Sequence, residues 1–454
     1  MSKQARSARA DLLPFASAAG NHLFVADGSR IYDIDEMLGR KLQELLDSLS
    51  ADQIWELLGL EGRATRGWID ERPSPVPALS SISLNVAQTC NMACGYCYAD
   101  EGRFGGSARV MAADVGRMAV DRLIAEAEPG ADLLVGFIGG EPLLNRRLIY
   151  DIVPYAAGRA GATGRRIRFS LTTNATLLAP DDAKLFASYP FAVQVSIDGP
   201  ALANDQQRPM RGGGGSYERV IRGLDILARC GRPRQLSARM TVTRQSDDLL
   251  GALEHLIDLG FDEVGFAPVL AAPAGGHALD DEDFEKLLDQ MLACGRKALA
   301  QLKAGQAYPF SNFLTAMEQI HRGSHRPYPC GAGAAYLSAS AEGKLYACHR
   351  LVDDPAFAMG HVSTGSDQAA RAKHLVSKHV DRMQPCSICW ARYLCGGGCY
   401  HEVARRGRPG CDYIRGWLAF CLGAYAELSI IYPHGLPVHR GCTDLTAEDV
   451  VLSS

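Results

Sequence analysis

Three cysteines stand close together in the pattern Cys90-x3-Cys94-x2-Cys97, directly after an apolar, strand-like stretch at residues 82–87. A loop this short directs three thiolates at one inorganic centre, which is how proteins hold iron–sulfur clusters. Four thiolates would coordinate every iron of a cubane cluster, whereas three leave one iron with an open position. The motif therefore predicts a cluster that binds a small molecule and takes part in a reaction.

A structural zinc site and a disulfide are the alternatives for this motif. Zinc sites usually combine two closely spaced pairs of Cys or His ligands, but Tyr98 follows Cys97 and no fourth ligand stands nearby in the sequence. A disulfide joins two cysteines and would leave the third over. The spacing therefore favours an iron–sulfur cluster.

The composition is that of an ordinary globular protein, 47% hydrophobic and 22% charged. The 454 residues predict about two to four domains. The net charge of −4 gives no indication of nucleic-acid binding. We expect no membrane span, because no apolar run approaches the ~18 residues that one needs. The Ala, Ser and Gly residues that follow Lys3, Arg6 and Arg9 do not fit a secretory signal, so we expect a cytoplasmic location.

The 14 cysteines are unevenly distributed: three stand at residues 90–97 and nine after residue 329. In a reducing cytoplasm such clusters bind metals more often than they form disulfides. Cys230 and Cys294 stand alone, and we expect both to be small buried apolar residues. After about residue 305 the apolar periodicity is lost and Cys and Gly become frequent, so we expect metal sites, either clusters or zinc, to hold this segment together.

The first 70 residues predict a small separate module. Residues 1–20 are expected to be a loose start. Two apolar runs on either side of Asp27-Gly28 predict a hairpin over residues 22–35, and apolar spacing predicts helices over residues 36–49 and 52–60. This winged-helix-like module resembles the precursor-recognition elements of peptide-modifying enzymes, which bind a leader peptide as an added strand. The alternative is a cap that only packs on the next domain. A proline-rich linker is expected over residues 71–80.

Strand-like and helix-like stretches alternate from residue 81 onward. Such repeated β-then-α units predict a parallel sheet with right-handed crossovers. Six units are too few for an eight-fold barrel, so the predicted fold is α/β, a partial (β/α)6 barrel over residues 81–305 with functional residues at the strand ends. The predicted strands are 82–87, 133–138, 167–172, 192–197, 236–243 and 263–269, and the predicted helices are 112–127, 145–160, 180–188, 216–229, 247–259 and 281–303.

Polar side chains stand at four of these strands. Two glycines allow the backbone to approach a ligand closely, a glutamate can accept from an ammonium group, an arginine can pair with a carboxylate, and an asparagine and a serine can bond a ribose. S-adenosylmethionine presents all of these groups. Each residue alone is equally well explained as a satisfied polar group at a strand, but together they favour a binding site. The candidate contacts are Gly139, Gly140, Glu141, Asn174, Ser196 and Arg239.

The Cys-x3-Cys-x2-Cys motif, with an aromatic residue before its third cysteine and Gly139-Gly-Glu-Pro142 further on, resembles the radical SAM superfamily. That resemblance implies a partial barrel, a [4Fe–4S] cluster on Cys90, Cys94 and Cys97, and S-adenosylmethionine bound at the open iron. Reduction of the sulfonium would give a 5′-deoxyadenosyl radical that abstracts hydrogen from a substrate.

The C-terminal pattern, Cys-x12-Gly-x4-Cys, then Cys-x2-Cys-x5-Cys-x3-Cys, then a last cysteine, resembles the SPASM domain, here over residues 306–454. SPASM domains carry two auxiliary iron–sulfur clusters. Some relatives have a further cysteine soon after the position of Cys330, which is missing here, so the first cluster would have an open iron or take Cys421, Cys442 or a non-cysteine ligand. The resemblance implies Cys330, Cys348 and Cys399 for the first cluster, and Cys386, Cys389, Cys395 and Cys411, with Cys421 as the alternate to Cys411, for the second.

Stretches such as Cys97-Tyr98-Ala99 and Cys348-His349-Arg350 resemble the thioether-forming peptide maturases, especially those that cross-link the small subunit of quinohemoprotein amine dehydrogenase. The resemblance implies an oxidoreductase that installs Cys sulfur-to-carbon cross-links in a ribosomally made peptide or small protein subunit. Its partners would be that substrate, bound through a leader, and an electron donor such as flavodoxin or ferredoxin, with no nucleic acid and no membrane. The alternatives are a radical SAM maturase that forms C–C or C–O cross-links or oxidises a side chain, and a zinc-stabilised peptide-binding chaperone.

Overall fold

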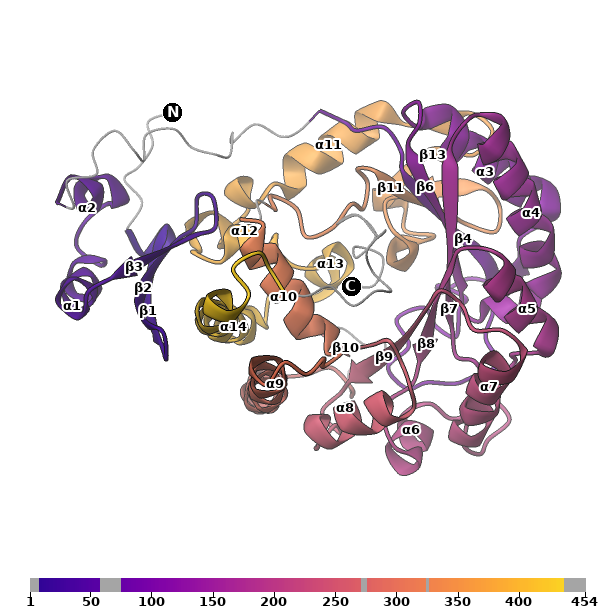
Figure 1. The fold of residues 1–454 in the computed structure, drawn as a ribbon. Coiled ribbons are helices and arrows are strands. Elements are labelled where there is room, and N and C mark those ends of the chain that lie inside the picture. The colour runs from indigo at the N-terminus through magenta and orange to yellow at the C-terminus, as the bar shows by residue number, and fades with distance from the viewer. Residues whose placement is uncertain (1–7, 58–74, 271–275, 324–325, 437–454) are drawn as a thin grey trace.

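The computed structural model describes residues 8–57, 75–270, 276–323 and 326–436. A small N-terminal module lies at the left of Figure 1, a curved sheet backed by helices lies at the right, and the C-terminal elements lie between them. The sheet and the C-terminal helices share one continuous buried apolar cluster, whereas the N-terminal module has a small core of its own.

The N-terminal module is a three-stranded antiparallel sheet with two helices. The hairpin predicted over residues 22–35 is confirmed, and Asp35 caps the first helix by accepting from the backbone N–H of Leu38 at 2.7 Å. The sequence does not predict the first strand, because Pro14 interrupts its apolar run. Residues 58–60 of the second predicted helix and residues 71–74 of the predicted linker lie outside the described residues. The elements are β1 (Leu12–Ser17), β2 (Gly20–Val25), β3 (Arg30–Ile34), α1 (Glu36–Leu45) and α2 (Ala51–Leu57).

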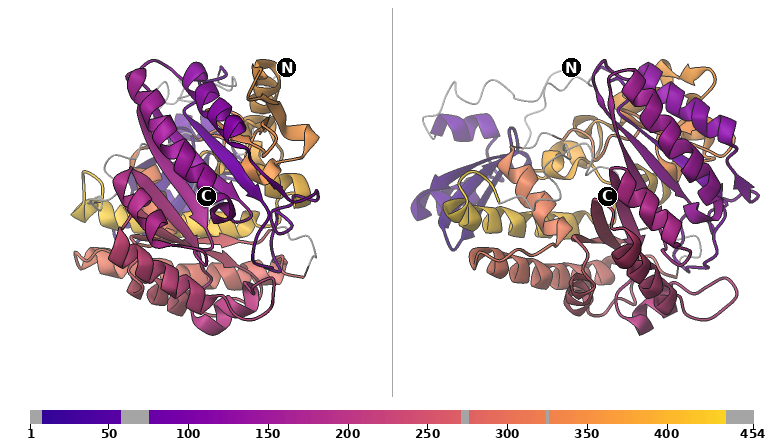
Figure 2. Two further views of the ribbon diagram at one scale, coloured as in Figure 1. Left: turned by 90° about the vertical axis from the view of Figure 1, so that its right-hand side faces the viewer. Right: turned by 45° about the vertical axis from the view of Figure 1, so that its right-hand side comes forward.

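The six predicted parallel strands are all present, in the order β10-β9-β8-β7-β6-β4. Helices cover the outer face of the curved sheet (Figures 1 and 2). The strands are β4 (Ser81–Gln88), β6 (Asp132–Gly139), β7 (Arg166–Thr173), β8 (Phe191–Ser196), β9 (Gln235–Val242) and β10 (Glu263–Pro268). The helices are α3 (Ala113–Glu126), α4 (Arg146–Ala162), α5 (Pro180–Ser188), α6 (Ala201–Gln207), α7 (Tyr217–Cys230), α8 (Leu249–Asp258) and α9 (Asp281–Lys303), of which the short α6 is not predicted from the sequence.

The C-terminal region continues the barrel sheet. β11 (Tyr336–Ala339) pairs in parallel with β4, and three short antiparallel strands extend the sheet further. Buried hydroxyls reinforce this junction, because Ser83 Oγ lies 2.7 Å from the hydroxyl of Tyr336. The sequence does not reveal this pairing, since four-residue strands are too short to show a period. The added strands are β12 (Lys344–Tyr346), β13 (Ala358–His361) and β14 (Gly365–Ser366), and a two-residue strand β5 (Arg109–Val110) pairs with β4.

The C-terminal helices pack on the barrel and reach back to the N-terminal module. α14 lies against α9, α10 and β1, and Trp417 contacts Phe310, Phe313 and Phe420 edge to face or tilted. Within the described residues, α14 is the one helix long and apolar enough on average to cross a membrane, although Asp412, Arg415 and Glu427 interrupt its apolar residues. The helices are α10 (Ser311–His321), α11 (Gln368–Lys378), α12 (Arg392–Cys395), α13 (Tyr400–Arg406) and α14 (Cys411–Ile431).

The two lone cysteines differ in burial. Cys294 is buried on α9, as predicted, whereas Cys230 is exposed at the end of α7, so the prediction for Cys230 is wrong. α7 buries Val220, Gly223 and Leu227, and Cys230 has the helical spacing of that buried face. Cys230 is nevertheless exposed, because it is the last residue of the helix, where the burial ends.

Candidate active site

Thirteen cysteines lie in the described residues and all are free of disulfides. Ten of them gather in three groups, which we call the loop set (Cys90, Cys94, Cys97), the inner set (Cys330, Cys348, Cys399) and the outer set (Cys386, Cys389, Cys395, Cys411). Members of each group lie close enough for their thiolate charges to raise one another's pKa. These are the groupings that the resemblance to the SPASM domain and the radical SAM superfamily implies.

The loop set follows β4 and is pressed against the Gly139-Gly140 turn at the end of β6. The backbone N–H of Glu141 donates to the carbonyl of Thr89 at 2.9 Å, and that of Gly140 donates to Ala87 at 2.8 Å. A Cβ on Gly140 would clash with the Thr89 carbonyl and contact Cys90 Cβ at 3.0 Å. The glycines are therefore required by the close approach of the cysteine loop itself, in addition to any ligand.

Burial is the largest cause that raises the pKa of Cys90 to about 12 and that of Cys94 to about 11, and neighbouring thiolates act in the same direction. A positively charged metal centre reverses this effect, since it replaces the thiol protons and stabilises the thiolates. The donor set therefore fits an iron–sulfur centre.

The Glu141 carboxylate is fully buried and is already held by three donors. It accepts from the Thr173 hydroxyl at 2.7 Å and from the backbone N–H groups of Asn174 at 2.7 Å and Leu143 at 3.0 Å. Burial raises its pKa, and the three hydrogen bonds oppose that effect. A carboxylate has about four acceptor positions, so one remains for the ammonium group predicted from the sequence.

Asn174 lies directly beside the loop set. Its side-chain amide donates to Asn91 Oδ1 at 2.9 Å and lies 3.8 Å from Cys90 Sγ. Its carbonyl oxygen accepts from the hydroxyl of Thr176 at 2.6 Å, which fixes the orientation of the amide. The structure thus brings Glu141, Asn174 and the loop set together at the ends of β6 and β7.

Ser196 and Arg239 are paired in register on β8 and β9. Burial lowers the pKa of Arg239 to about 10, with Arg350 lowering it further and Cys399 raising it. The charges that act on Arg239 therefore belong to the inner set and its neighbours. No hydrogen bond or ion pair within the described residues engages its guanidinium.

A buried hydrogen-bond network lies beside Cys94 and is not predicted from the sequence. The Tyr96 hydroxyl donates to Asp198 Oδ2 at 2.6 Å, Arg208 donates to the Tyr96 oxygen, and Arg208 Nη1 lies 3.9 Å from Asp198 Oδ1. Arg208 lowers the pKa of Cys94, whose larger shift is the rise due to burial. Asp198 directly follows the fourth barrel strand, so its strand-end position was a usable signal, whereas nothing in the sequence around Arg208 marks it.

Tyr98 separates the loop set from the inner set. Burial raises its pKa, and the charges that raise it further belong to Cys97, Cys348 and Cys399. The Arg350 guanidinium lies over its ring at 4.8 Å, and the ring of His401 lies edge-on at 5.6 Å. One aromatic side chain thus touches the surroundings of both cysteine sets.

The inner set comes from three distant segments. Cys330 precedes β11, Cys348 follows β12, and Cys399 is the N-cap of α13. Burial raises the pKa of Cys330 to about 11 and also raises that of Cys348, which the other two thiolates raise further. The sheet extension that pairs β11 with β4 therefore brings Cys330 and Cys348 into the barrel side of the molecule.

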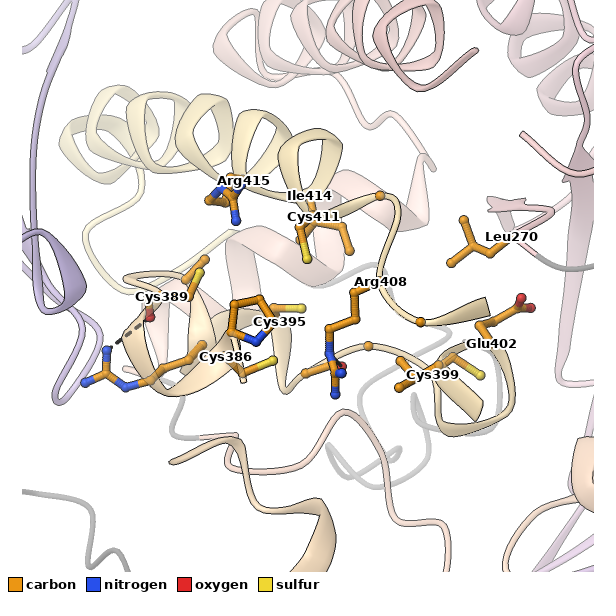
Figure 3. Close-up of a pocket in the computed structure, with 18 residues that line it drawn as sticks. Leu270, Cys386, Cys389, Cys395, Cys399, Glu402, Arg408, Cys411, Ile414 and Arg415 are labelled. Carbon is orange, nitrogen blue, oxygen red and sulfur yellow. Dashed lines mark hydrogen bonds between the residues drawn. The ribbon is translucent and has the colours of Figure 1, made fainter. Parts of the chain in front are cut away.

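The outer set surrounds a cavity of about 60 Å³. Figure 3 shows the four cysteines around this space, with Arg408 and Arg415 beside them and Cys399 and Glu402 further along the same cavity. Cys421 is ten residues beyond Cys411 on α14, which is ~15 Å along a helix, and burial raises its pKa. Cys442 lies outside the described residues.

Within the described ranges, no group of three or more His, Cys, Asp or Glu side chains is placed to hold a single metal ion. A zinc site requires four ligand atoms converging on one point, whereas a cluster several atoms across is bound by more widely spaced thiolates. Iron–sulfur clusters are held by Cys thiolates, which are the groups that the three sets supply.

Residues 84–257 match the sequence model of the Radical SAM superfamily. The chain is 24% identical over 347 residues to a serine-type anaerobic sulfatase-maturating enzyme of Klebsiella aerogenes, covering 72% of this chain and 81% of that protein. It is also 26% identical over 334 residues to an uncharacterized protein of Archaeoglobus fulgidus, covering 70% of this chain and 74% of that one.

Two groups of solved structures share the fold. The structure of anSMEcpe with bound AdoMet aligns with a TM-score of 0.66 and 19% identity, covering 81% of this chain and 97% of the other. Streptococcus suis SuiB bound to the precursor peptide SuiA aligns with a TM-score of 0.52 and 15% identity, covering 89% and 98%. The family match includes the loop set, Glu141, Asn174 and Arg239 on the α/β barrel; the chain carries a Radical SAM domain over residues 84–257.

Proposed function

We propose that this enzyme is a maturase that forms thioether cross-links, joining cysteine sulfur to carbon within a ribosomally made peptide or small protein subunit. The observation that carries the proposal is that Tyr98 lies near thiols of both the loop set and the inner set, because the charges of Cys97, Cys348 and Cys399 all raise its pKa. Joining sulfur to an unactivated carbon needs a radical source and an electron acceptor close to each other. The sequence resemblance to the thioether-forming maturases, including those of quinohemoprotein amine dehydrogenase, adds support.

The proposed cofactors are S-adenosylmethionine and three iron–sulfur clusters, one on each cysteine set. Raised thiol pKa values in all three sets support this assignment, because buried thiolates need a positive centre. When bound, the loop-set cluster and S-adenosylmethionine supply a carbon-centred radical, and an auxiliary cluster accepts the surplus electron. We assign the ligands to Cys90, Cys94 and Cys97, to Cys330, Cys348 and Cys399, and to Cys386, Cys389, Cys395 and Cys411.

The chain itself positions S-adenosylmethionine and excludes water. Glu141 keeps one acceptor position for the ammonium group, and the fixed amide of Asn174 and the hydroxyl of Ser196 are placed at strand ends for polar contacts. The buried Arg208 puts a positive charge beside Cys94. Arg239 receives the least support among the predicted contacts, since the groups acting on it belong to the inner set. We assign the contacts to Gly139, Gly140, Glu141, Asn174, Ser196 and Arg239.

The N-terminal module would deliver the peptide. β3 is an outer strand of its sheet, paired with β2 among the described residues, and Tyr32 on it is 44% exposed. An outer strand presents unpaired backbone groups, so a leader peptide can bind as a fourth strand. SuiB is known in complex with a precursor peptide, and anSMEcpe in complex with a Cp18Cys peptide, which supports a peptide substrate for the shared fold. An external one-electron donor of the flavodoxin or ferredoxin type would reduce the loop-set cluster in the cytoplasm.

The proposal is tested by turnover of the anaerobically reconstituted protein with dithionite and S-adenosylmethionine. We expect 5′-deoxyadenosine from the natural chain and none from Cys94→Ala, with Cys230→Ala as the matched control because that thiol is exposed and far along the chain from the three sets. Unchanged turnover by Cys94→Ala would exclude radical chemistry at the loop set. A brown protein absorbing near 400 nm distinguishes clusters from the zinc-bound chaperone alternative, which would be colourless.

A loss of two hydrogens from the peptide does not distinguish a thioether from a C–C or C–O cross-link or from an oxidised side chain. Alkylation of the substrate cysteines before reaction does, because a thioether former then gives no product. Continued loss of two hydrogens from an alkylated peptide would replace the thioether proposal with one of these alternatives.

A further inference from the structure

The inner set has three cysteines, and no fourth thiol within the described residues joins it. Cys421 belongs to the packed interior of α14, with Tyr413 among the groups near it, and Cys442 lies outside the described residues. A cubane cluster on three thiolates leaves one iron without a protein ligand. A non-cysteine side chain must therefore be sought in contact with this site.

Glu402 stands at the required place on α13. Cys399 is the N-cap of this helix and Glu402 is its third residue. Side chains at these two helix positions lie next to each other, which is the geometry that capping boxes use. Both residues line the cavity drawn in Figure 3, on the side away from Cys386 and Cys389.

The Glu402 carboxylate has one occupied and one unoccupied oxygen. Its side chain is 7% exposed, and Oε1 accepts from Arg350 Nη1 at 2.7 Å. Oε2 is buried and has no hydrogen-bond partner among the described residues. Leaving a buried charged oxygen without a partner costs several kcal/mol, so the site is complete only when a positive group binds there.

Arg350 connects this carboxylate to the inner set. Its backbone N–H donates to Cys348 Sγ at 3.5 Å while its guanidinium holds Glu402 Oε1. The ion pair fixes the carboxylate beside Cys348 and Cys399 and leaves Oε2 as the free donor atom. Carboxylate oxygen is an established kind of metal ligand, harder and more readily exchanged than thiolate.

We propose that Glu402 supplies the fourth ligand, through Oε2, of the cluster held by Cys330, Cys348 and Cys399. This inference rests on the proposed function, because it requires an iron–sulfur cluster on the inner set. It makes the inner cluster one of mixed ligands, three sulfurs and one oxygen, whereas the outer cluster has four sulfurs. The oxygen-bound iron is then the one most easily lost.

The test uses the full chain with Cys90, Cys94 and Cys97 all replaced by Ala, so that the labile loop-set cluster does not contribute. After anaerobic reconstitution and mild oxidation, we expect Glu402→Gln to lose about one more iron per chain than its parent and to develop the electron paramagnetic resonance signal of a three-iron cluster. Glu402→Cys restores a fourth ligand and should keep the iron.

A control variant separates ligation from structural effects. Glu427→Gln alters a carboxylate that pairs with Lys303 on α9 and should change nothing. Equal iron in Glu402→Gln and its parent overturns the inference, and so does equal loss from Glu402→Gln and Glu402→Cys. A parent that binds no iron overturns the proposed function as well, which distinguishes the two failures.

Discussion

The inner and outer cysteine sets belong to the same C-terminal region but are held by different parts of the molecule. The inner set is tied to the barrel, through the pairing of β11 with β4 and through the contact of Tyr336 with Ser83 and with His349 Nδ1 at 2.9 Å. The outer set is tied to the N-terminal module. Arg392, beside Cys389 and Cys395, donates to the carbonyl of Ala10 and to the carboxylate of Asp11.

Arg392 connects the outer set to the N-terminal module. It also donates to the Cys389 carbonyl at 3.0 Å and lies 3.4 Å from Asp381, and both of these charged side chains are nearly fully buried. Trp390 packs edge-on against Phe24 of the N-terminal sheet, with ring centroids 5.9 Å apart. A change in the N-terminal module therefore reaches the outer set directly, whereas the inner set responds to the barrel and its ligands.

The largest expected difference between the two sets is in iron content. Cys348→Ala leaves the inner set with two thiolates and should lose its whole cluster, whereas Cys411→Ala leaves the outer set with three and should lose about one iron. Iron per chain and the electron paramagnetic resonance spectrum after anaerobic reconstitution measure this. Equal losses from the two variants would mean that the two clusters do not differ in their number of thiolate ligands.

The barrel strands and the membership of the cysteine sets could be predicted from the sequence, because both depend on the spacing of residues along the chain. All six barrel strands follow from apolar runs, and the groupings of Cys330, Cys348 and Cys399 and of the outer four are implied by the resemblance of the cysteine pattern to the SPASM domain. The geometry brings the same residues together. The alternate Cys421 is on the same helix as Cys411 but a long way further along it, which helix periodicity alone indicates.

Contacts between residues far apart in the sequence could not be predicted from residue spacing. Nothing near Arg208 or Arg392 in the sequence marks a residue that joins distant segments, because such ion pairs form between positions hundreds of residues apart. Glu402 was equally hidden, since a single acidic residue in a short helix is ordinarily solvated. Arg239 was selected correctly as an unusual cation in a strand, but the strand pattern does not say which group it faces.

The next largest effect is expected from Arg392→Ala. Removing this guanidinium leaves the buried Asp381 without its cation and breaks the bonds to Ala10 and Asp11, so the free energy of unfolding should fall by about 3–5 kcal/mol. Arg371→Ala is the matched control: that side chain is also buried but donates to the neutral carbonyls of Pro77 and Ala334, so its loss should cost less. Denaturant unfolding measures both, and equal losses would show that Arg392 is only a packing residue.

A smaller loss of stability is expected from a substitution at Gly396, where the inner and outer sets meet. Gly396, next to Cys395, has φ +74°, and a Cβ there would come within 2.6 Å of the backbone of Pro329, which precedes Cys330. Gly396→Ala should therefore cost about 2–4 kcal/mol, combining the strain of positive φ with the clash. Gly305→Ala, just after α9, has the same φ of +74° but open space around it, so it should cost only about 1 kcal/mol. Equal costs would mean that the sets are not in tight contact.

The smallest expected effect is a pH dependence of the free energy of unfolding that is due to His374, which packs against the inner set. Its ring meets Tyr400 edge-on at 4.9 Å and would touch a Cβ on Gly333, so it fills the space between the Cys330 turn and α13. Burial, and then the charge of Lys378, lowers its pKa to about 4. The unfolded chain therefore binds a proton near pH 6.5 that the folded chain takes up only near pH 4. Stability is full above pH 6.5 and falls as the pH drops through this window, by about 1 kcal/mol between pH 7 and 5.5.

His374→Gln removes this dependence, so its free energy of unfolding should vary less with pH over the same range. Denaturant unfolding at pH 7 and 5.5 measures the change. Burial, and then the charge of Arg350, also lowers the pKa of His349, to about 3. The free energy of unfolding of the His374 variant should therefore still decrease somewhat as the pH falls. A slope identical to that of the natural chain would mean that His374 stays as solvated in the folded chain as in the unfolded one, and that the inner set is less tightly enclosed than its burial implies.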